Sequence, residues 1–182
     1  MVKTIGMIEL NSIARGIETA DTMLKAGEVE LLLAKTVCPG KYLILITGNV
    51  GAVKSSVETG TELGSEYVVD TLVIPNVHPQ VIPAISATNA FDGLKALGIL
   101  EYFSIATAIV GADQAVKSAD IQLIEIRLGI GIGGKAFVTL TGDVSAVKNA
   151  VEVGSNIGKR NGMLVNKAVI PFPKKELLES LV

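Results

Sequence analysis

The sequence contains one unit twice, and this duplication limits the folds that the chain can adopt. Ordered matches connect the two halves, first at an offset of 92 residues (Gly6 with Gly98), then at 94 (Lys41 with Lys135) and later at 96. The matched segments are Gly6-Met7-Ile8-Glu9 with Gly98-Ile99-Leu100-Glu101, Ser12-Ile13-Ala14 with Ser104-Ile105-Ala106, Ala20-Asp21 with Ala112-Asp113, Thr47-Gly48-Asn49-Val50 with Thr141-Gly142-Asp143-Val144, and Val73-Ile74-Pro75 with Val169-Ile170-Pro171. A repeat of this length indicates tandem copies of one folding unit. We therefore expect a first domain with its linker over residues 1–90 and a second domain over residues 91–182.

Each unit has the pattern strand, helix, strand, strand, helix, strand. The strands of the first unit are expected at 4–10, 29–37, 41–47 and 67–74, with the helices in the remaining intervals. Ser12 and Asn49 are placed to cap these helices, Asp143 has the capping position in the second copy, and Gly27 is placed to end the first helix. The apolar residues on one face of the first helix are Ile13, Ile17, Ala20 and Leu24. This order predicts the α+β class, an α/β sandwich of two tandem ferredoxin-like domains with both helices on one face of each sheet.

Composition limits the partners. The formal net charge is −2, and the lysines and arginines do not form the dense clusters that phosphate binding needs, so nucleic acid is not expected as a partner. No apolar run approaches the ~18 residues of a membrane span and no secretory signal is visible, so no membrane is expected either. A single cysteine cannot form an internal disulfide, which favours a reducing compartment and hence the cytoplasm.

The single cysteine lies in a loop that the second unit does not copy. The segment Thr36-Val37-Cys38-Pro39-Gly40-Lys41 joins two apolar runs, whereas its counterpart at 128–135 is rich in glycine and has no cysteine. By itself Cys38 is most simply a structural thiol that packs as a small hydrophobe. Its position before Pro-Gly in a turn is also a weak signal of an iron–sulfur ligand.

Other residue types that can carry chemistry have simpler interpretations here. The glycine loop at 129–134 lies between two strands without a following helix N-terminus, so it lacks the context of a dinucleotide-binding motif. Glu9 and Glu101 match because the whole unit repeats, and we expect them to pair with backbone or lysine groups. His78 has no nearby Ser or Cys for a catalytic triad and is expected at the surface or an interface. The chain is therefore not expected to be an enzyme.

Together these motifs resemble the bacterial microcompartment shell domain. The shared features are the duplicated Gly-Met-Ile-Glu opening, a lysine in the last turn of the first helix, the loop before a Gly-Lys strand start, and the Thr-Gly-Asp/Asn-Val-x-Ala-Val helix entry. The resemblance covers essentially all 182 residues and occurs twice, as in tandem-domain shell proteins. One departure is that Asn76 and Phe172 stand where the family often has an arginine of the tile edge, so lateral contacts at these positions do not follow from the resemblance.

The resemblance implies a flat pseudohexameric tile made of three copies of the chain. The loops between the second and third strands of each unit would line a central pore and bring three Cys38 thiolates to one point. These would hold a [4Fe–4S] cluster shared by three subunits, which an aerobic preparation can destroy. The pore-lining residues that the resemblance implies are Val37, Cys38, Pro39, Gly40, Gly131, Ile132 and Gly133. Lys25 and Lys117 match the edge lysines that pack tile against tile.

The function that the resemblance implies is structural. The chain would tile the shell of a bacterial microcompartment in the cytoplasm and pass electrons, or a cluster, across that wall. Its partners would be two further copies, other shell proteins and encapsulated redox enzymes. By ligand count, three thiolates also suit zinc. A second hypothesis keeps the tile but gives it a metal-free metabolite pore lined by Cys38. A third is a duplicated ferredoxin-like sensor or enzyme that uses the glycine loop or a reactive Cys38.

Overall fold

A computed structural model describes residues 4–90, 93, 95–174 and 176–177. The chain divides into two compact units, Met1–Val77 and His78–Val182, and each is described by itself. The domain boundary expected from the repeat lies between residues 90 and 91. In the structure the linker that follows the first repeat packs with the second unit, because its short helix contacts a strand of that unit.

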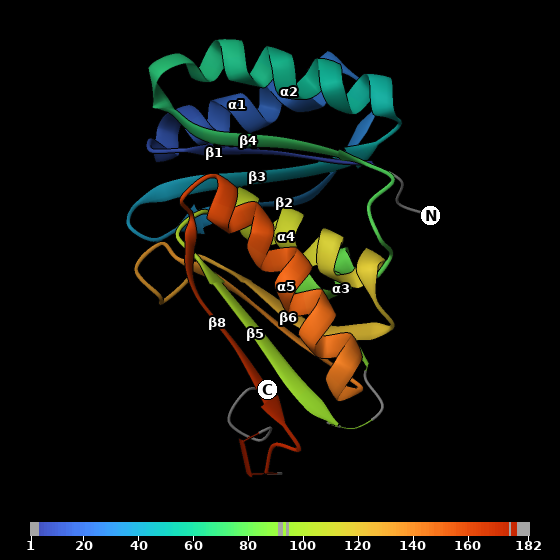
Figure 1. Cartoon of the computed structure of the whole chain (residues 1–182). Coiled ribbons are helices and arrows are strands. Elements are labelled where there is room, and N and C mark those ends of the chain that lie inside the picture. The colour runs from blue at the N-terminus through green and yellow to red at the C-terminus, as the bar shows by residue number, and fades with distance from the viewer. Residues whose placement is uncertain (1–3, 91–92, 94, 175, 178–182) are drawn as a thin grey trace. The chain divides into compact units, whose positions relative to one another are not determined.

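The first unit is a four-stranded antiparallel sheet with two helices on one face (Figure 1). Its elements are β1 (Thr4–Leu10), α1 (Ile13–Ala26), β2 (Val29–Val37), β3 (Lys41–Gly48), α2 (Val50–Gly64), a single 3₁₀ turn (Ser65–Tyr67) and β4 (Val68–Pro75). The strand order is β2-β3-β1-β4, so β2 and β4 are the edge strands. This order confirms the ferredoxin-like topology predicted from the β-α-β-β-α-β pattern.

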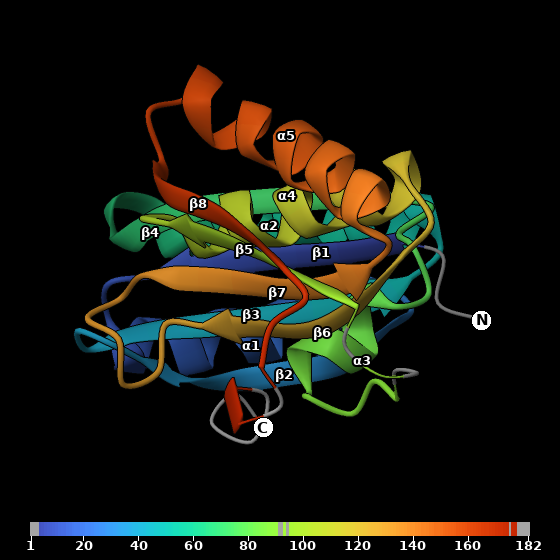
Figure 2. The same cartoon turned by 60° about the horizontal axis from the view of Figure 1, so that its bottom comes forward.

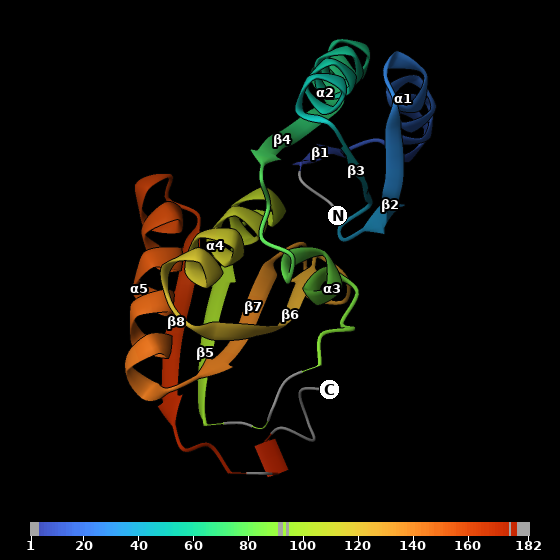
Figure 3. The same ribbon diagram turned by 90° about the vertical axis from the view of Figure 1, so that its right-hand side faces the viewer.

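The second unit repeats this topology and adds the linker helix. Its elements are α3 (Val81–Ile85), β5 (Ala96–Tyr102), α4 (Ile105–Ser118), β6 (Ile121–Leu128), β7 (Ala136–Gly142), α5 (Val144–Arg160) and β8 (Leu164–Pro171). The strand order is β6-β7-β5-β8, and Figure 3 shows α4 and α5 together on one face of the sheet. The same order in both units confirms the tandem duplication as a structural fact.

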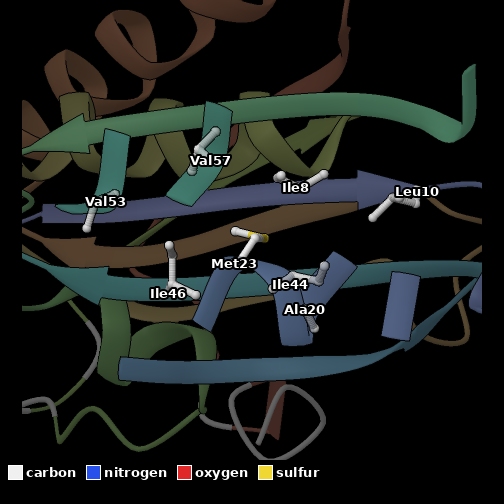
Figure 4. Packing of buried hydrophobic residues seen from close by; sticks show 8 residues of the cluster. All are labelled: Ile8, Leu10, Ala20, Met23, Ile44, Ile46, Val53 and Val57. Carbon is white, nitrogen blue, oxygen red and sulfur yellow. The ribbon is translucent and has the colours of Figure 1, made fainter. Parts of the chain in front are cut away.

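A compact apolar core joins helices and sheet in the first unit (Figure 4). Its buried side chains alternate along the strands and recur at helical spacing, as one-sided elements require. The members are Ile8, Leu10, Ala20, Met23, Ile44, Ile46, Val53 and Val57. Glycines at the interface let backbone and side chains approach closely: a Cβ at Gly60 would lie 2.6 Å from Met23 Cγ.

Two of the three predicted helix caps form. The Ser12 hydroxyl accepts a hydrogen bond from the Arg15 N–H, and the Asn49 side chain accepts one from the Ala52 N–H. At Asp143 the prediction is wrong in part. The residue precedes α5, but its carboxylate makes no capping hydrogen bond and instead accepts from Lys95 Nζ at 3.0 Å.

The apolar face expected on the first helix is only partly buried. Ala20 is buried, while Ile13, Ile17 and Leu24 remain exposed, Ile17 by 55%. The core contacts of α1 come instead from its small residues and Met23. At the matching positions of α4, Ile105, Ile109 and Val116 are all buried. The two repeats therefore have the same fold but differ in which helix face is covered.

Candidate functional site

The β2–β3 turn holds the thiol that the sequence singled out. Val37 pairs with Lys41 across the antiparallel ladder, and the Gly40 N–H donates to the Val37 carbonyl at 3.0 Å, which closes the turn. Gly40 has φ +86°, a conformation that favours glycine, and a Cβ there would meet no atom within 4 Å. Cys38 is half-buried with a free thiol, Pro39 and Gly40 are exposed, and Val37 is buried.

The β6–β7 turn is longer and rich in glycine. The Gly129 N–H donates to the Lys135 carbonyl at 3.1 Å, and the Lys135 N–H donates to the Ile132 carbonyl at 3.3 Å. Positive φ values occur at Gly129, Gly131, Gly133 and Gly134. Among the predicted pore residues of this turn, Gly131 and Gly133 are exposed and Ile132 is half-buried. Only glycine adopts such a run of left-handed residues without strain, which explains the composition of this loop.

An ion pair braces the strand that follows each of these turns. Lys41 Nζ lies 2.6 Å from Glu9 Oε1, and Lys135 Nζ lies 2.5 Å from Glu101 Oε1. The prediction that the two glutamates serve as partners for lysines is confirmed. The pairs differ in their environment, because the Glu9 side chain is 2% exposed and the Glu101 side chain 32%. The ion pair beside the turn that carries Cys38 is therefore the more deeply buried of the two.

One chain does not by itself assemble a metal site in the part that the structure describes. Across these residues no group of three or more His, Cys, Asp or Glu side chains gathers at one point. Since the sequence has a single cysteine, each chain supplies one thiolate ligand at most. A metal centre at Cys38 would therefore have to draw on more than one copy.

The two predicted edge lysines lie in different surroundings. Lys25 pairs with Asp21 at 2.5 Å, and both side chains are largely exposed (74% and 63%). Lys117 pairs with Asp113 at 2.6 Å, but the Asp113 side chain is 2% exposed. Asp113 also accepts the backbone N–H of His78 at 2.8 Å, which ties the linker to α4. Lys117 therefore supports a buried contact, whereas Lys25 is held by surface groups alone.

His78 begins the linker and is half-buried. Burial lowers the pKa of its imidazole, while Asp113 acts to raise that pKa and Lys117 acts to lower it. Its Nδ1 accepts the Gln80 N–H at 3.3 Å, which is a bond that requires an unprotonated nitrogen. The roles of Asp113 and Gln80 were not predicted from the sequence. Only the repeated Ala-Asp pair, Ala20-Asp21 and Ala112-Asp113, pointed toward the first of them.

Comparison with known proteins decides the family. The BMC domain matches the chain twice, at residues 4–77 and 96–173. The chain belongs to the bacterial microcompartment shell proteins. It is 46% identical over 182 residues to the bacterial microcompartment shell protein PduT of Citrobacter freundii, covering all of this chain and 99% of that protein.

Solved structures agree with this assignment. The crystal structure of a microcompartment protein from Desulfitobacterium hafniense superposes with a TM-score of 0.92 at 55% identity, covering 98% of this chain and 99% of that one. A fused permuted hexameric shell protein from the RMM microcompartment is 22% identical, with a TM-score of 0.62 over 84% of this chain and 79% of its own. This second likeness concerns the fold alone.

The family match confirms several expectations. The chain is a structural component of a bacterial microcompartment shell rather than an enzyme, and its place is the shell of that cytoplasmic body. The resemblance of the motifs to the shell domain, present twice along the chain, is also confirmed. Within the described ranges, no helix combines the length and the apolar character that crossing a bilayer requires.

Proposed function

We propose that three copies of this shell protein form a pseudohexameric tile whose central pore is lined by the β2–β3 and β6–β7 turns. In this tile three Cys38 thiolates hold a [4Fe–4S] cluster that serves electron transfer, or cluster transport, across the shell. The observation that carries the proposal is the asymmetry between the turns: one half-buried free thiol on the first turn and glycine backbone on the second. If the two turns alternate around the pore, Cys38 occurs on every second turn, and the thiols have threefold symmetry.

Exposed apolar surface supports assembly into a closed ring. Ile13, Ile17 and Leu24 leave one face of α1 uncovered in the single chain, although the matching face of α4 is buried. A comparable difference affects the edge strands, where Ile170 on β8 is 36% exposed and its counterpart Ile74 on β4 is 9% exposed. In a ring made of repeated units, equivalent faces are buried at equivalent junctions. A neighbouring copy would bury the two faces that one chain leaves open.

The residues of the first turn fit a thiolate-bound cluster. Cys38 is half-buried, and the space beside Gly40 in the same turn is open, since a Cβ there would meet no atom within 4 Å. Lys41 and Glu9 hold the base of the turn through a mostly buried ion pair. Iron–sulfur clusters are held by cysteine thiolates and, when bound, supply one-electron redox chemistry at a potential set by their surroundings. Three Cys38 thiolates bind three of the four irons, so the fourth iron would need a different ligand.

Two alternatives keep the same tile. Three thiolates with an open fourth position also suit zinc by ligand number. Without any metal, the turns would form a metabolite pore lined by Cys38 and glycine backbone, and the open space around Gly40, Gly131 and Gly133 favours this second function. In both cases the tile would meet other shell proteins along its edges, with Lys25 and Lys117 as contact residues. In the redox case, encapsulated redox enzymes would be further partners.

Metal analysis of anaerobically purified protein tests the proposal. We expect about four iron and four sulfide ions per three chains, and a brown protein that becomes colourless in the Cys38→Ser variant. Size-exclusion chromatography should give trimers for both proteins, which shows that the variant still assembles. Wild-type trimers without iron or zinc would refute the cluster and support the metabolite pore, whereas iron-free trimers with stoichiometric zinc would support the zinc site. Monomers at high concentration would count against every version of the tile.

A further inference from the structure

In the second unit, the linker closes the free edge of the sheet. Strand β6 is an edge strand, and the side chain of Gln80 pairs with its outward-facing backbone. Gln80 Oε1 accepts the Leu123 N–H at 2.8 Å, and Gln80 Nε2 donates to the Ile121 carbonyl at 3.4 Å. Asn89 Nδ2 donates to the Leu123 carbonyl at 2.9 Å. The backbone groups that an edge strand usually leaves open are thus satisfied by the linker.

The same linker covers the edge with apolar side chains. Helix α3 lies beside β6 (Figure 2), and the two elements are in contact. Val81 and Ala84 of α3 are completely buried, and so is Leu123 of β6. Closure of this edge therefore combines side-chain hydrogen bonds with a small hydrophobic contact.

In the first unit, the matching edge is open. Strand β2 has the same register, since Leu31 lies opposite Ile46 just as Leu123 lies opposite Leu140. Leu31 is nevertheless 44% exposed, whereas Leu123 is fully buried. None of the described residues donates to or accepts from Leu31 as the linker does with Leu123. The segment after β4 cannot cover β2 in its own unit, because from His78 onward it belongs to the second unit.

The C-terminal segment repeats the linker in sequence, and its described residues repeat one hydrogen bond of the linker. At the offset of 96 residues, Val81 corresponds to Leu177 and His78 to Lys174. The Val81 N–H donates to the His78 carbonyl at 3.0 Å, and the Leu177 N–H donates to the Lys174 carbonyl at 3.1 Å. The linker has apolar residues at 81, 82 and 85, and the C-terminal segment has leucines at 177, 178 and 181. Leu177, however, is 36% exposed where Val81 is buried.

We propose that the C-terminal residues Lys174, Glu176 and Leu177 dock on the open β2 edge of a second copy of the chain. Leu177 would cover Leu31, as Val81 covers the β6 edge in the second unit. Glu176 would take the place of Gln80 and accept the Leu31 N–H. The occupant is a second copy because Leu31 stays 44% exposed within one chain.

Electrostatics favour the same docking. Asp21 corresponds to Asp113, and it uses only Oδ2 in its pair with Lys25. Its Oδ1 can accept the Lys174 N–H, as Asp113 Oδ1 accepts the His78 N–H. Lys174 would also bring positive charge toward Asp21 of α1 and toward Glu28 and Glu30 at the β2 edge.

This inference rests on the proposed ring, and cross-linking separates the two. In a Cys38→Ser background, one tagged chain carries Leu31→Cys and a differently tagged chain carries Leu177→Cys. A short bismaleimide should join the co-expressed chains into a product with both tags. Leu123→Cys replaces Leu31→Cys in the matched control and should give no such product, because α3 covers that site. Trimers without the mixed product would overturn the docking but not the tile, whereas monomers would overturn both.

A second measurement does not depend on introduced thiols. Glu176→Gln adds a donor for the Val29 carbonyl, by analogy with Gln80 and Ile121. It should lower the dissociation constant of the trimer about threefold to tenfold. Leu177→Asp should raise this constant by more than tenfold, because it places a charge against Leu31. Unchanged dissociation in both variants would overturn the proposed docking.

Discussion

Removal of the Asp113 carboxylate should destabilise the protein far more than removal of its counterpart in the first repeat, Asp21. Asp113 accepts two hydrogen bonds, from the His78 N–H at 2.8 Å and from Lys117 Nζ at 2.6 Å, while its side chain is 2% exposed. Among the described residues, Asp21 makes the matching lysine pair alone, with its side chain 63% exposed. The repeat thus provides a matched control within the same molecule.

The expected magnitudes follow from these environments. In Asp113→Ala, the orphaned His78 N–H costs about 1–3 kcal/mol. The unpaired Lys117 adds less than a buried ion would, because it is 33% exposed and water can reach it. We therefore expect a loss of about 2–4 kcal/mol in the free energy of unfolding. An exposed i,i+4 pair contributes only about 0.3–0.5 kcal/mol, so Asp21→Ala should lose no more than this.

Urea unfolding at a fixed protein concentration measures both losses. We expect a lower midpoint with an unchanged m-value for Asp113→Ala, and a midpoint close to that of the wild type for Asp21→Ala. Asp113→Asn should fall between them, because the amide oxygen can still accept the His78 N–H. Equal losses for the two alanine variants would refute the argument that the linker contact, rather than the lysine pair, makes Asp113 important.

Three further predictions use the same approach. Glu9→Gln should cost about 1–3 kcal/mol in urea unfolding and Glu101→Gln less than about 1 kcal/mol, since only the first carboxylate is fully buried, and a reversed order would contradict this. Tyr102→Phe should cost about 1–2 kcal/mol because it leaves the buried Gly154 carbonyl without its 2.9 Å donor; an unchanged midpoint would show that this bond adds nothing. Burial lowers the pKa of His78 below 6.5, so its contribution to stability is present above about pH 6.5 and is lost as pH falls through the folded pKa. Melting temperature should therefore fall less on acidification in His78→Asn than in the wild type, and parallel curves would argue against this residue.

Much of the fold could be predicted because the sequence contains the pattern of the same folding unit twice. Every strand of the first unit lies within a residue or two of its expected bounds, and the caps at Ser12 and Asn49 form as predicted. These features depend on local chemistry, which the sequence displays directly. Asp143 shows the limit of such reasoning, since it precedes its helix without capping it and pairs with Lys95, which is distant in sequence.

Features that depend on a partner could not be predicted in the same way. Helical periodicity groups Ile13, Ile17 and Leu24 on one face but does not tell what covers that face. The contact between Asp113 and His78 joins segments 35 residues apart and has no periodic signal. The cluster at Cys38 stays a prediction for a related reason, because its other ligands would come from other chains.

The covered β6 edge and the open β2 edge also have a kinetic consequence. Helix α3 closes β6 from within its own unit, so folding of that unit alone removes one template for unwanted strand pairing. The edge of strand β2 would remain a template for strand pairing until another chain covers it. The rate of that step depends on protein concentration. In a newly synthesised chain, correct assembly would therefore compete kinetically with aggregation through β2. The soluble yield of this protein should depend on how quickly its copies meet.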